Sequence, residues 1–187
     1  MVQSKLIIEY YQSIFDHEYF FHGIHADRLV ALTSQFGKSA SMKLLQRNVD
    51  VFMIAPVIGF IYGKRAALDN SQPDRTINFA QMTYYKSDLI FNYRLVILLD
   101  KDYEPDPQKR LDKAFRFMGT PQAEPDEKRF EEYMRGGIDV LYEKLVEGDS
   151  TPEAFANRLY EFIDEFNDRF NSEISSDDIL QLCVNKS

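Results

Sequence analysis

All three histidines of this chain lie within nine residues of one another, and imidazole is a common metal ligand. They are His17, His22 and His25, and three carboxylates stand beside them, on Asp16, Glu18 and Asp27. Nitrogen and oxygen donors of this kind suit zinc or another transition metal. The spacing matches no recurrent metal motif such as H-E-x-x-H, and aromatic residues are interleaved with the histidines. We therefore expect partly exposed histidines without a bound metal, with a metal site at these three residues as the alternative.

The carboxylates and the single cysteine do not indicate a defined active site. Asp88 and Asp100 are flanked by apolar sequence, and helix-surface or capping roles suit them better than catalysis. Cys183 has no basic residue directly beside it that would activate the thiol. The chain has no Walker loop, no G-x-G-x-x-G and no G-x-S-x-G motif. We predict no catalytic residue and no cofactor, with an enzyme of dispersed carboxylates as an alternative.

Charge is unevenly distributed along the chain, whose formal net charge is −8. Residues 1–100 carry 10 basic and 9 acidic residues, whereas residues 101–187 carry 12 and 21. Because Lys and Arg supply the binding free energy along a phosphate backbone, nucleic acid is expected to bind only the first half. A lone cysteine fits a reducing compartment, and the first residues lack the pattern of a secretory signal. We expect a cytoplasmic protein with no membrane association.

Residues 51–62, VFMIAPVIGFIY, contain no charged side chain and no side-chain amide. Twelve residues are too few to span a bilayer, which takes about 20, and an element that is apolar on all sides is buried on all sides. We therefore predict a central, wrapped helix over residues 41–62, kinked at Pro56 by a missing hydrogen bond. The alternative makes residues 51–61 two short buried strands that turn at Pro56.

Three further segments have the pattern of helices. Residues 79–99 are aromatic and interrupted only by single polar residues, and their length favours helix over strand. A shorter helix is expected between Asp106 and Gly119. The third covers residues 130–145 and contains Gly136-Gly137, a pair that marks either a kink or a close helix crossing.

The helix predicted over residues 151–170 is the most clearly amphipathic. Thr151 suits the N-cap and Pro152 the first helical position. Apolar residues recur at spacings of three or four and form one stripe: Phe155, Leu159, Phe162, Phe166 and Phe170. The remaining surface carries four carboxylates that we expect to lie in water: Glu161, Asp164, Glu165 and Asp168. They are the candidate contacts for a basic protein partner, because clustered charge speeds encounter.

These elements together predict an all-α protein, a single-domain helical bundle around a buried central helix. The domain is expected to span residues 1–172, and a short helix with a flexible tail is expected over residues 173–187. Short strands near residues 19–26 or 51–61 are the alternative at those two places.

Residues 27–49, DRLVALTSQFGKSASMKLLQRNV, resemble the two helices of a ribbon-helix-helix DNA-binding domain. Leu29 and Leu32 would face the core, Gly37 would end the first helix, and Ser39 or Ser41 would cap the second. The small helical subunit of DNA phosphorothioation systems has a broadly similar helix pair.

This resemblance implies contact with DNA. In the ribbon-helix-helix family a strand before the first helix enters the major groove as a paired ribbon, and here that segment is residues 19–26. His22 and His25 stand there in place of the usual Arg, Lys, Asn or Gln. The basic residues that would contact DNA are Arg28, Lys38, Lys43 and Arg47.

The sequence favours a non-enzymatic helical subunit or adaptor that acts by binding another macromolecule. A protein partner or a second copy of the chain is expected, and tyrosines such as Tyr84 and Tyr85 suit an interface because Tyr is frequent at binding hot spots. The first alternative is a DNA-associated accessory or regulatory protein that uses residues 19–49. The second alternative is the enzyme with dispersed carboxylates.

Overall fold

The computed structural model describes residues 11–34, 43–69, 71, 73–148 and 151–170, and within them it is helical apart from one two-stranded sheet. In chain order the elements are β1 (Tyr19–His22), α1 (Gly23–Thr33), α2 (Asn48–Ile61), β2 (Pro73–Ile77), α3 (Phe79–Leu99), α4 (Pro107–Leu111), the π-helical η1 (Asp112–Arg116), the 3-10 turn η2 (Pro121–Ala123), α5 (Glu124–Leu145) and α6 (Pro152–Phe170). The predicted all-α class is confirmed. The helix and tail predicted over residues 173–187 lie outside the described residues.

The apolar segment forms α2, a single helix that begins later than expected. Residues 43–47 are not helical, and Arg47 is the N-cap, joined to Asp50 in a capping box. The helix continues through Pro56 to Ile61, so the alternative of two strands over residues 51–61 is wrong. Ile54 is 41% exposed. The expectation that this segment is wrapped on every side is therefore wrong as well.

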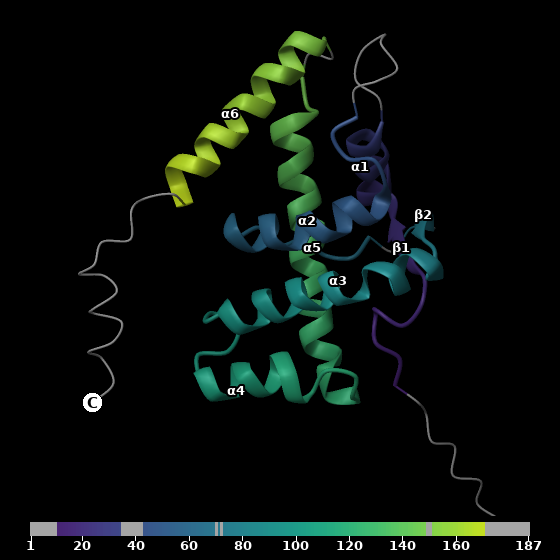
Figure 1. The fold of residues 1–187 in the computed structure, drawn as a ribbon, viewed down its shortest axis with the longest axis vertical. Helices are drawn as coiled ribbons and strands as arrows, with labels where there is room; N and C mark the ends of the chain where they lie inside the picture. The colour runs from purple at the N-terminus through teal and green to yellow at the C-terminus, as the bar shows by residue number, and fades with distance from the viewer. Residues whose placement is uncertain (1–10, 35–42, 70, 72, 149–150, 171–187) are drawn as a thin grey trace, which may run out of the picture.

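The central position belongs to α5, which runs the length of the molecule while α2, α3 and α4 cross it on one side (Figure 1). Every residue from 133 to 141 is buried. On another side α5 packs against α1, which in turn contacts both strands of the short sheet. The buried central helix of the prediction thus exists, but it is α5 rather than α2.

The crossing of α2 over α5 depends on paired glycines. A Cβ placed on Gly137 would lie 1.7 Å from the Ala55 carbonyl oxygen, and one on Gly59 would lie 2.0 Å from the Tyr133 carbonyl oxygen. Both positions require glycine because the two backbones touch. The Gly136-Gly137 pair therefore marks a close crossing, and α5 continues through it without a break.

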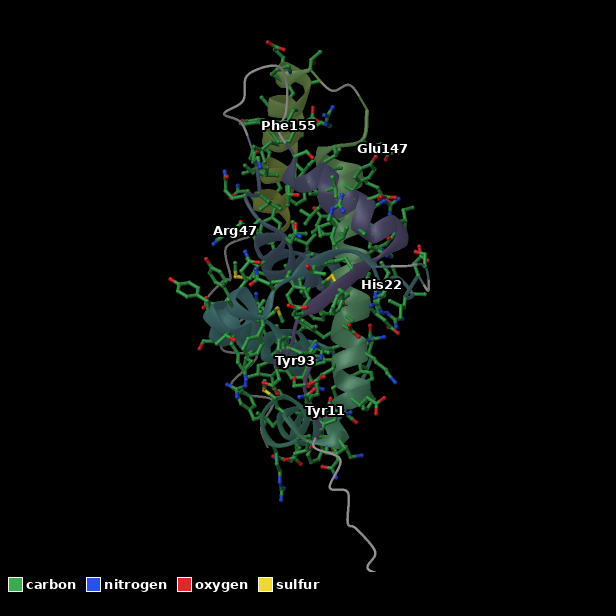
Figure 2. All side chains as sticks on the ribbon, turned by 90° about the vertical axis from the view of Figure 1, so that its right-hand side faces the viewer. Tyr11, His22, Arg47, Tyr93, Glu147 and Phe155 are labelled. Atoms are coloured by element: carbon green, nitrogen blue, oxygen red, sulfur yellow. The ribbon has the colours of Figure 1, made fainter. Side chains whose placement is uncertain are left out.

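Between α5 and the layer of α2 and α3 lies the aromatic core, with Tyr93 inside it (Figure 2). Phe130 from α5 makes edge contacts with Phe15, Phe52 and Tyr93, at ring-centroid distances of 6.0, 6.2 and 5.6 Å. Such pairs stabilise a core by about 0.5–1.5 kcal/mol each beyond their area burial. The core therefore joins the N-terminal segment, α2, α3 and α5.

β1 and β2 pair antiparallel, with Tyr19 opposite Ile77, which confirms a short strand near residues 19–26.

Helix α6 contacts the rest of the protein through its apolar stripe: Phe155 is buried and the Phe162 ring stacks on Tyr62 at a centroid distance of 6.3 Å. The side chain of Phe170 lies outside the described set. The expectation that Glu165 lies free in water is wrong, because Lys144 donates to its Oε2 at 2.6 Å.

Candidate functional site

Helix α3 is apolar on its outer side as well as on its inner side. Its core-facing residues are Met82, Leu89, Tyr93, Val96 and Ile97. The opposite surface carries Tyr84, Phe91, Leu95 and Leu99, at spacings of seven, four and four residues that place them on one side of a helix. We call the surface formed by these four residues the α3 face. Tyr84 is 80% exposed, Phe91 65% and Leu99 48%.

The α3 face is also poor in charge. The 21 residues of α3 include three charged residues, Lys86, Asp88 and Arg94, and of these Asp88 is exposed while the other two are half-buried. An ordinary surface helix has an apolar stripe toward the core and charged residues toward water. Asp88 follows Tyr84 by four residues and therefore lies on the same side of the helix, so the α3 face is apolar surface with one exposed carboxylate. Exposed apolar surface of this kind is typical of a binding site for another macromolecule.

Beside the α3 face, three side chains form a stack on the flank that faces α2. The Arg47 guanidinium lies 4.9 Å from the Tyr85 ring centroid, and the Tyr84 and Tyr85 rings meet edge to face at 4.7 Å. Arg47 also donates to the Tyr85 hydroxyl and pairs with Asp50 at 2.7 Å. The stack lines an open depression of about 480 Å³ together with Asn78, Ala80 and Gln81. Tyr and Arg are the residue types enriched at binding hot spots.

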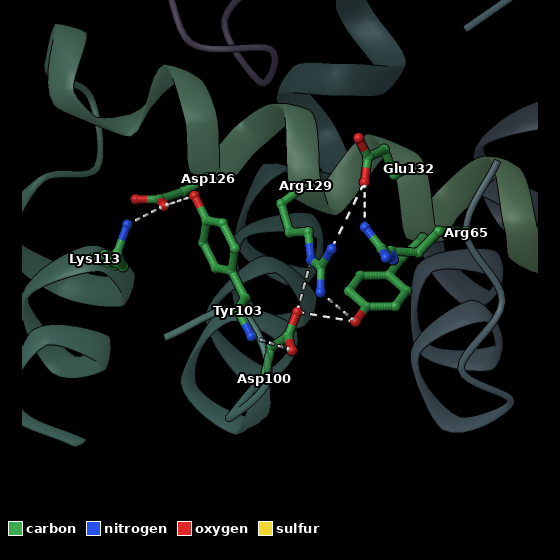
Figure 3. A network of polar contacts seen from close by, with 8 residues as sticks. Arg65, Asp100, Tyr103, Lys113, Asp126, Arg129 and Glu132 are labelled. Atoms are coloured by element: carbon green, nitrogen blue, oxygen red, sulfur yellow. Dashed lines mark hydrogen bonds and ion pairs between the residues drawn. The ribbon is translucent and has the colours of Figure 1, made fainter. Parts of the chain in front are cut away.

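A network of charged groups joins the first half of α5 to the loop after α3 (Figure 3). Arg129 donates to Asp100 at 2.8 Å, and the Tyr133 hydroxyl donates to the same carboxylate oxygen at 2.9 Å. Burial by itself would raise the Asp100 pKa, but these donors outweigh it and hold that pKa below its ordinary value. Burial and the bond to Asp100 raise the pKa of Tyr133 to about 12. The network thus favours an ionised, firmly held Asp100.

The neighbouring carboxylates of α5 are also buried and bonded. Tyr103 and Lys113 each donate to Asp126 Oδ1 at 2.7 Å, and Ser13 donates to Glu127 at 2.6 Å. Burial raises the Glu131 pKa, and Tyr19 donates to this carboxyl at 2.8 Å. These bonds fix the N-terminal segment and the α4 region on α5. Asp126 and Glu127 are 0% and 3% exposed, so an incoming substrate would not reach them as the structure stands.

The three histidines do not converge. His17 Nδ1 contacts the Glu18 carbonyl oxygen at 2.7 Å, and His22 Nδ1 contacts that of Ser71 at 2.9 Å. His25 is buried, with Nε2 3.2 Å from Asp139 Oδ1, within ion-pair reach but not aligned as a hydrogen bond. Within the described ranges, no group of three or more His, Cys, Asp or Glu side chains is placed to hold a metal ion.

Two of the residues that the resemblance assigns to DNA contact already pair with carboxylates of this chain. Arg28 pairs with Asp139 and lies 5.2 Å from the Tyr142 ring centroid. Arg47 pairs with Asp50, Lys43 is half-buried, and Lys38 lies outside the described residues. The strand expected to form a ribbon with a second chain is already paired along one edge with β2.

The acidic side of α6 is presented to solvent. Glu161, Asp164 and Asp168 are exposed, and together with Glu165 they border a shallow, open depression. Glu165 bonds to Lys144 and to the Tyr62 hydroxyl and therefore helps to hold α6 on the body. The three remaining carboxylates are the part of the predicted partner surface that the structure leaves accessible.

Sequence reasoning singled out Tyr84 and Tyr85 but missed the α3 face as a unit. A signal for it exists in the sequence. Residues 79–99 have apolar side chains at positions that fall on both sides of a helix, and few charges separate them. A helix of that kind is either enclosed by its own chain or covered by a partner, and the residues that the structure describes leave one side of α3 uncovered.

No protein-family model matches the chain, and no characterised protein and no solved structure is detectably similar to it. Among the described residues, no helix combines the length and the apolar character needed to cross a membrane.

Proposed function

We propose that this protein is a non-enzymatic helical subunit that binds another protein through the α3 face. The observation that carries this proposal is the exposure of Tyr84, Phe91 and Leu99 on a helix with one exposed charge. Large apolar side chains in water cost free energy that a partner recovers by covering them, at about 25 cal/mol per Å² of apolar surface buried. The neighbouring stack of Arg47, Tyr85 and Tyr84 is held in place before binding, which lowers the entropy cost of association.

The chemistry of the α3 face defines its partner. A charge-poor surface is best covered by one that is also mostly apolar, since a charged group buried there would lack a counter-ion unless it were a cation beside Asp88. A second copy of this chain presents such a surface, and so does an apolar helix face of another protein. The occupant we propose is therefore a protein surface of this apolar type.

The charge pattern favours a protein over nucleic acid as the partner. Binding along a phosphate backbone depends on Lys and Arg that exchange counter-ions for phosphates. Arg28 and Arg47 already pair with carboxylates of this chain, and Lys86 pairs with Asp16. A polyanion would have to compete with each of these carboxylates.

The test compares two charge insertions at exposed apolar positions. Phe91→Lys alters the α3 face, whereas Ile163→Lys, at a residue 57% exposed on α6, is the matched control. Each protein is examined by sedimentation velocity over a concentration series and by co-purification from its native host. The proposal predicts an assembly that forms with the parent protein and with Ile163→Lys but is lost with Phe91→Lys.

Three results would overturn it. The first is an assembly that survives Phe91→Lys unchanged, and the second is no assembly with the parent protein. The third is a gel shift with duplex DNA that weakens steeply with salt and is insensitive to Phe91→Lys, because that behaviour marks phosphate contacts made elsewhere.

A further inference from the structure

A second cavity lies on the other flank of α3, away from α2. It has a volume of about 230 Å³ and is enclosed by three parts of the chain: the segment around Ser13–Asp16, the α3 flank, and the turn after η1. The residues that matter for its chemistry are Arg94 and Lys86 from α3, Asp16 from the N-terminal segment, and Phe115 and Met118 from the η1 region. This cavity is distinct from the α3 face.

Arg94 lines this cavity without a hydrogen-bond or ion-pair partner among the described residues. Its Nε is buried and unbonded, and its guanidinium lies over the Phe115 ring at 5.0 Å from the centroid. By contrast, Arg28, Arg47 and Arg129 all pair with carboxylates. An arginine stays charged at every physiological pH, so the unused donors of Arg94 are available to an acceptor from outside the chain.

The charges around the cavity select for an anion of single charge. Lys86 and Arg94 are positive and Asp16 is negative, and Lys86 bonds to Asp16. The lining is therefore positive by one unit in a chain of net charge −8. A carboxylate carries one negative charge and matches the planar fork of a guanidinium with two parallel hydrogen bonds.

The remaining walls select for an apolar body. Ile90, Phe115 and Met118 contribute apolar surface, and thioether and aromatic groups suit contact with a flat ring. The volume lies just below the range of about 300–1,000 Å³ typical of ligand sites, so the occupant is smaller than a drug-sized molecule. Ser13, which is buried in the lining, donates its hydroxyl to Glu127, so Arg94 is the donor that remains for an anion.

We propose that this cavity binds a small monocarboxylate with an aromatic or short aliphatic body. Its carboxylate is held by Arg94, and its body lies against Phe115 and Met118. The site is separate from the protein-binding surface proposed above, and neither inference depends on the other.

The experiment is a titration of the whole protein with phenylacetate and with phenylacetamide, followed by amide chemical shifts in two-dimensional NMR. The amide analogue keeps the size and the ring but lacks the charge. We expect saturable shifts around the cavity with the acid, and at least about tenfold weaker binding of the amide, the usual effect of losing a hydrogen bond between charged groups. This comparison uses the parent protein and needs no variant to fold.

Two variants locate the effect. Arg94→Gln should weaken phenylacetate binding about tenfold or more. The matched control is Arg116→Gln, an arginine of η1 whose side chain is 77% exposed and which pairs with Asp112, and it should bind like the parent. A tripeptide that ends in phenylalanine is titrated in the same way to identify the source of the carboxylate that Arg94 binds. Tighter binding of the peptide than of phenylacetate assigns this carboxylate to a protein C-terminus. Tighter binding of phenylacetate assigns it to a free acid.

The proposal is overturned if phenylacetate produces no saturable shifts up to the millimolar range. It is also overturned if acid and amide bind equally, or if Arg94→Gln, shown to be folded by its spectrum, binds as tightly as the parent.

Discussion

The burial of helices α5 and α3 is the reverse of what their compositions predict. α5 has 11 charged residues among 22 and is the most deeply enclosed element, whereas α3 has three among 21 and exposes Tyr84, Phe91 and Leu99. The charges of α5 are tolerated inside because each finds a partner: Arg129 donates to Asp100, and Asp126 accepts from Lys113. The apolar face of α3 has no such complement within the described chain. Burial in this protein therefore follows from which groups find partners, and not from hydropathy alone.

The largest effect is expected from breaking the charge network of α5. Asp100→Ala leaves the half-buried Arg129 with Glu132 at 3.9 Å as its remaining carboxylate, so we expect a loss of unfolding free energy at the lower end of the about 3–5 kcal/mol that breaking a buried pair costs. Chemical denaturation measures this cost. Asp88→Ala, at the exposed aspartate of α3, is the matched control and should leave the melting temperature nearly unchanged. Equal effects of the two substitutions would remove the distinction between the helices.

A second test concerns the place where α2 crosses α5. Gly137→Ala puts a methyl group against the Ala55 carbonyl and should destabilise the protein by about 2–3 kcal/mol. Helix propensity acts in the opposite direction, since Ala is better than Gly by about 1 kcal/mol. At Gly63 the added methyl group meets nothing within 4 Å and only the positive φ of 62° opposes it, so Gly63→Ala should cost about 1 kcal/mol. A stabilising Gly137→Ala would mean that the helices are further apart.

Two carboxylates that α5 holds should affect the pH dependence of stability in opposite directions. The lowered pKa of Asp100 contributes stability above the pKa of the unfolded chain, and this contribution is lost as the pH falls through the folded value. The raised pKa of Glu131 contributes stability at low pH that is lost as the pH rises through its folded value.

These two opposite pH dependences of stability are measured by chemical denaturation between pH 3 and 8, an interval that spans ordinary carboxyl pKa values of about 4. Asp100→Asn should reduce the loss of stability on the acid side. Glu131→Gln should stabilise the protein near neutral pH and have little effect in acid. The same sign for both substitutions would contradict the environments described for the two groups.

Substitution within the α3 face should leave folding nearly intact. Phe91→Ser removes a ring that is 65% exposed, so we expect a loss of no more than about 0.5 kcal/mol. Phe130→Ala, in the core, should cost about 3–5 kcal/mol. Thermal melts of the two variants side by side make the comparison, and a large loss for Phe91→Ser would place its ring in the core.

The smallest effect is expected at the acidic side of α6. Glu165→Lys breaks the bond to Lys144 and should cost up to about 1 kcal/mol, whereas Asp164→Lys should leave the melting temperature unchanged. Equal melting temperatures for both would show that Glu165 does not hold α6 on the body.

Periodicity identified helices where one side faces the core, as in α6, and length identified α3. The hydropathy pattern placed the central helix at α2 instead of α5, because it cannot show that Arg129 and Asp100, 29 positions apart, form a hydrogen-bonded ion pair. The start of α2 was wrong because the capping box of Arg47 and Asp50 fixes it at Asn48, against an expectation near Ser41. Gly137 was identified as special, but its partner Gly59 follows only from the crossing itself. Arg94 could not be found from the sequence, because only the fold shows that it has no hydrogen-bond or ion-pair partner among the described residues.

The central claim is that the α3 face contacts another protein, and a photo-crosslinker placed at position 91 tests it most directly. Benzoylphenylalanine replaces Phe91 in the native host, and the same group at Ile163 serves as the reference position. The account predicts a discrete protein adduct, with a second copy or another chain, from position 91 that disappears when Leu99→Lys is added. No protein adduct from position 91, or one that Leu99→Lys leaves unchanged, would contradict it.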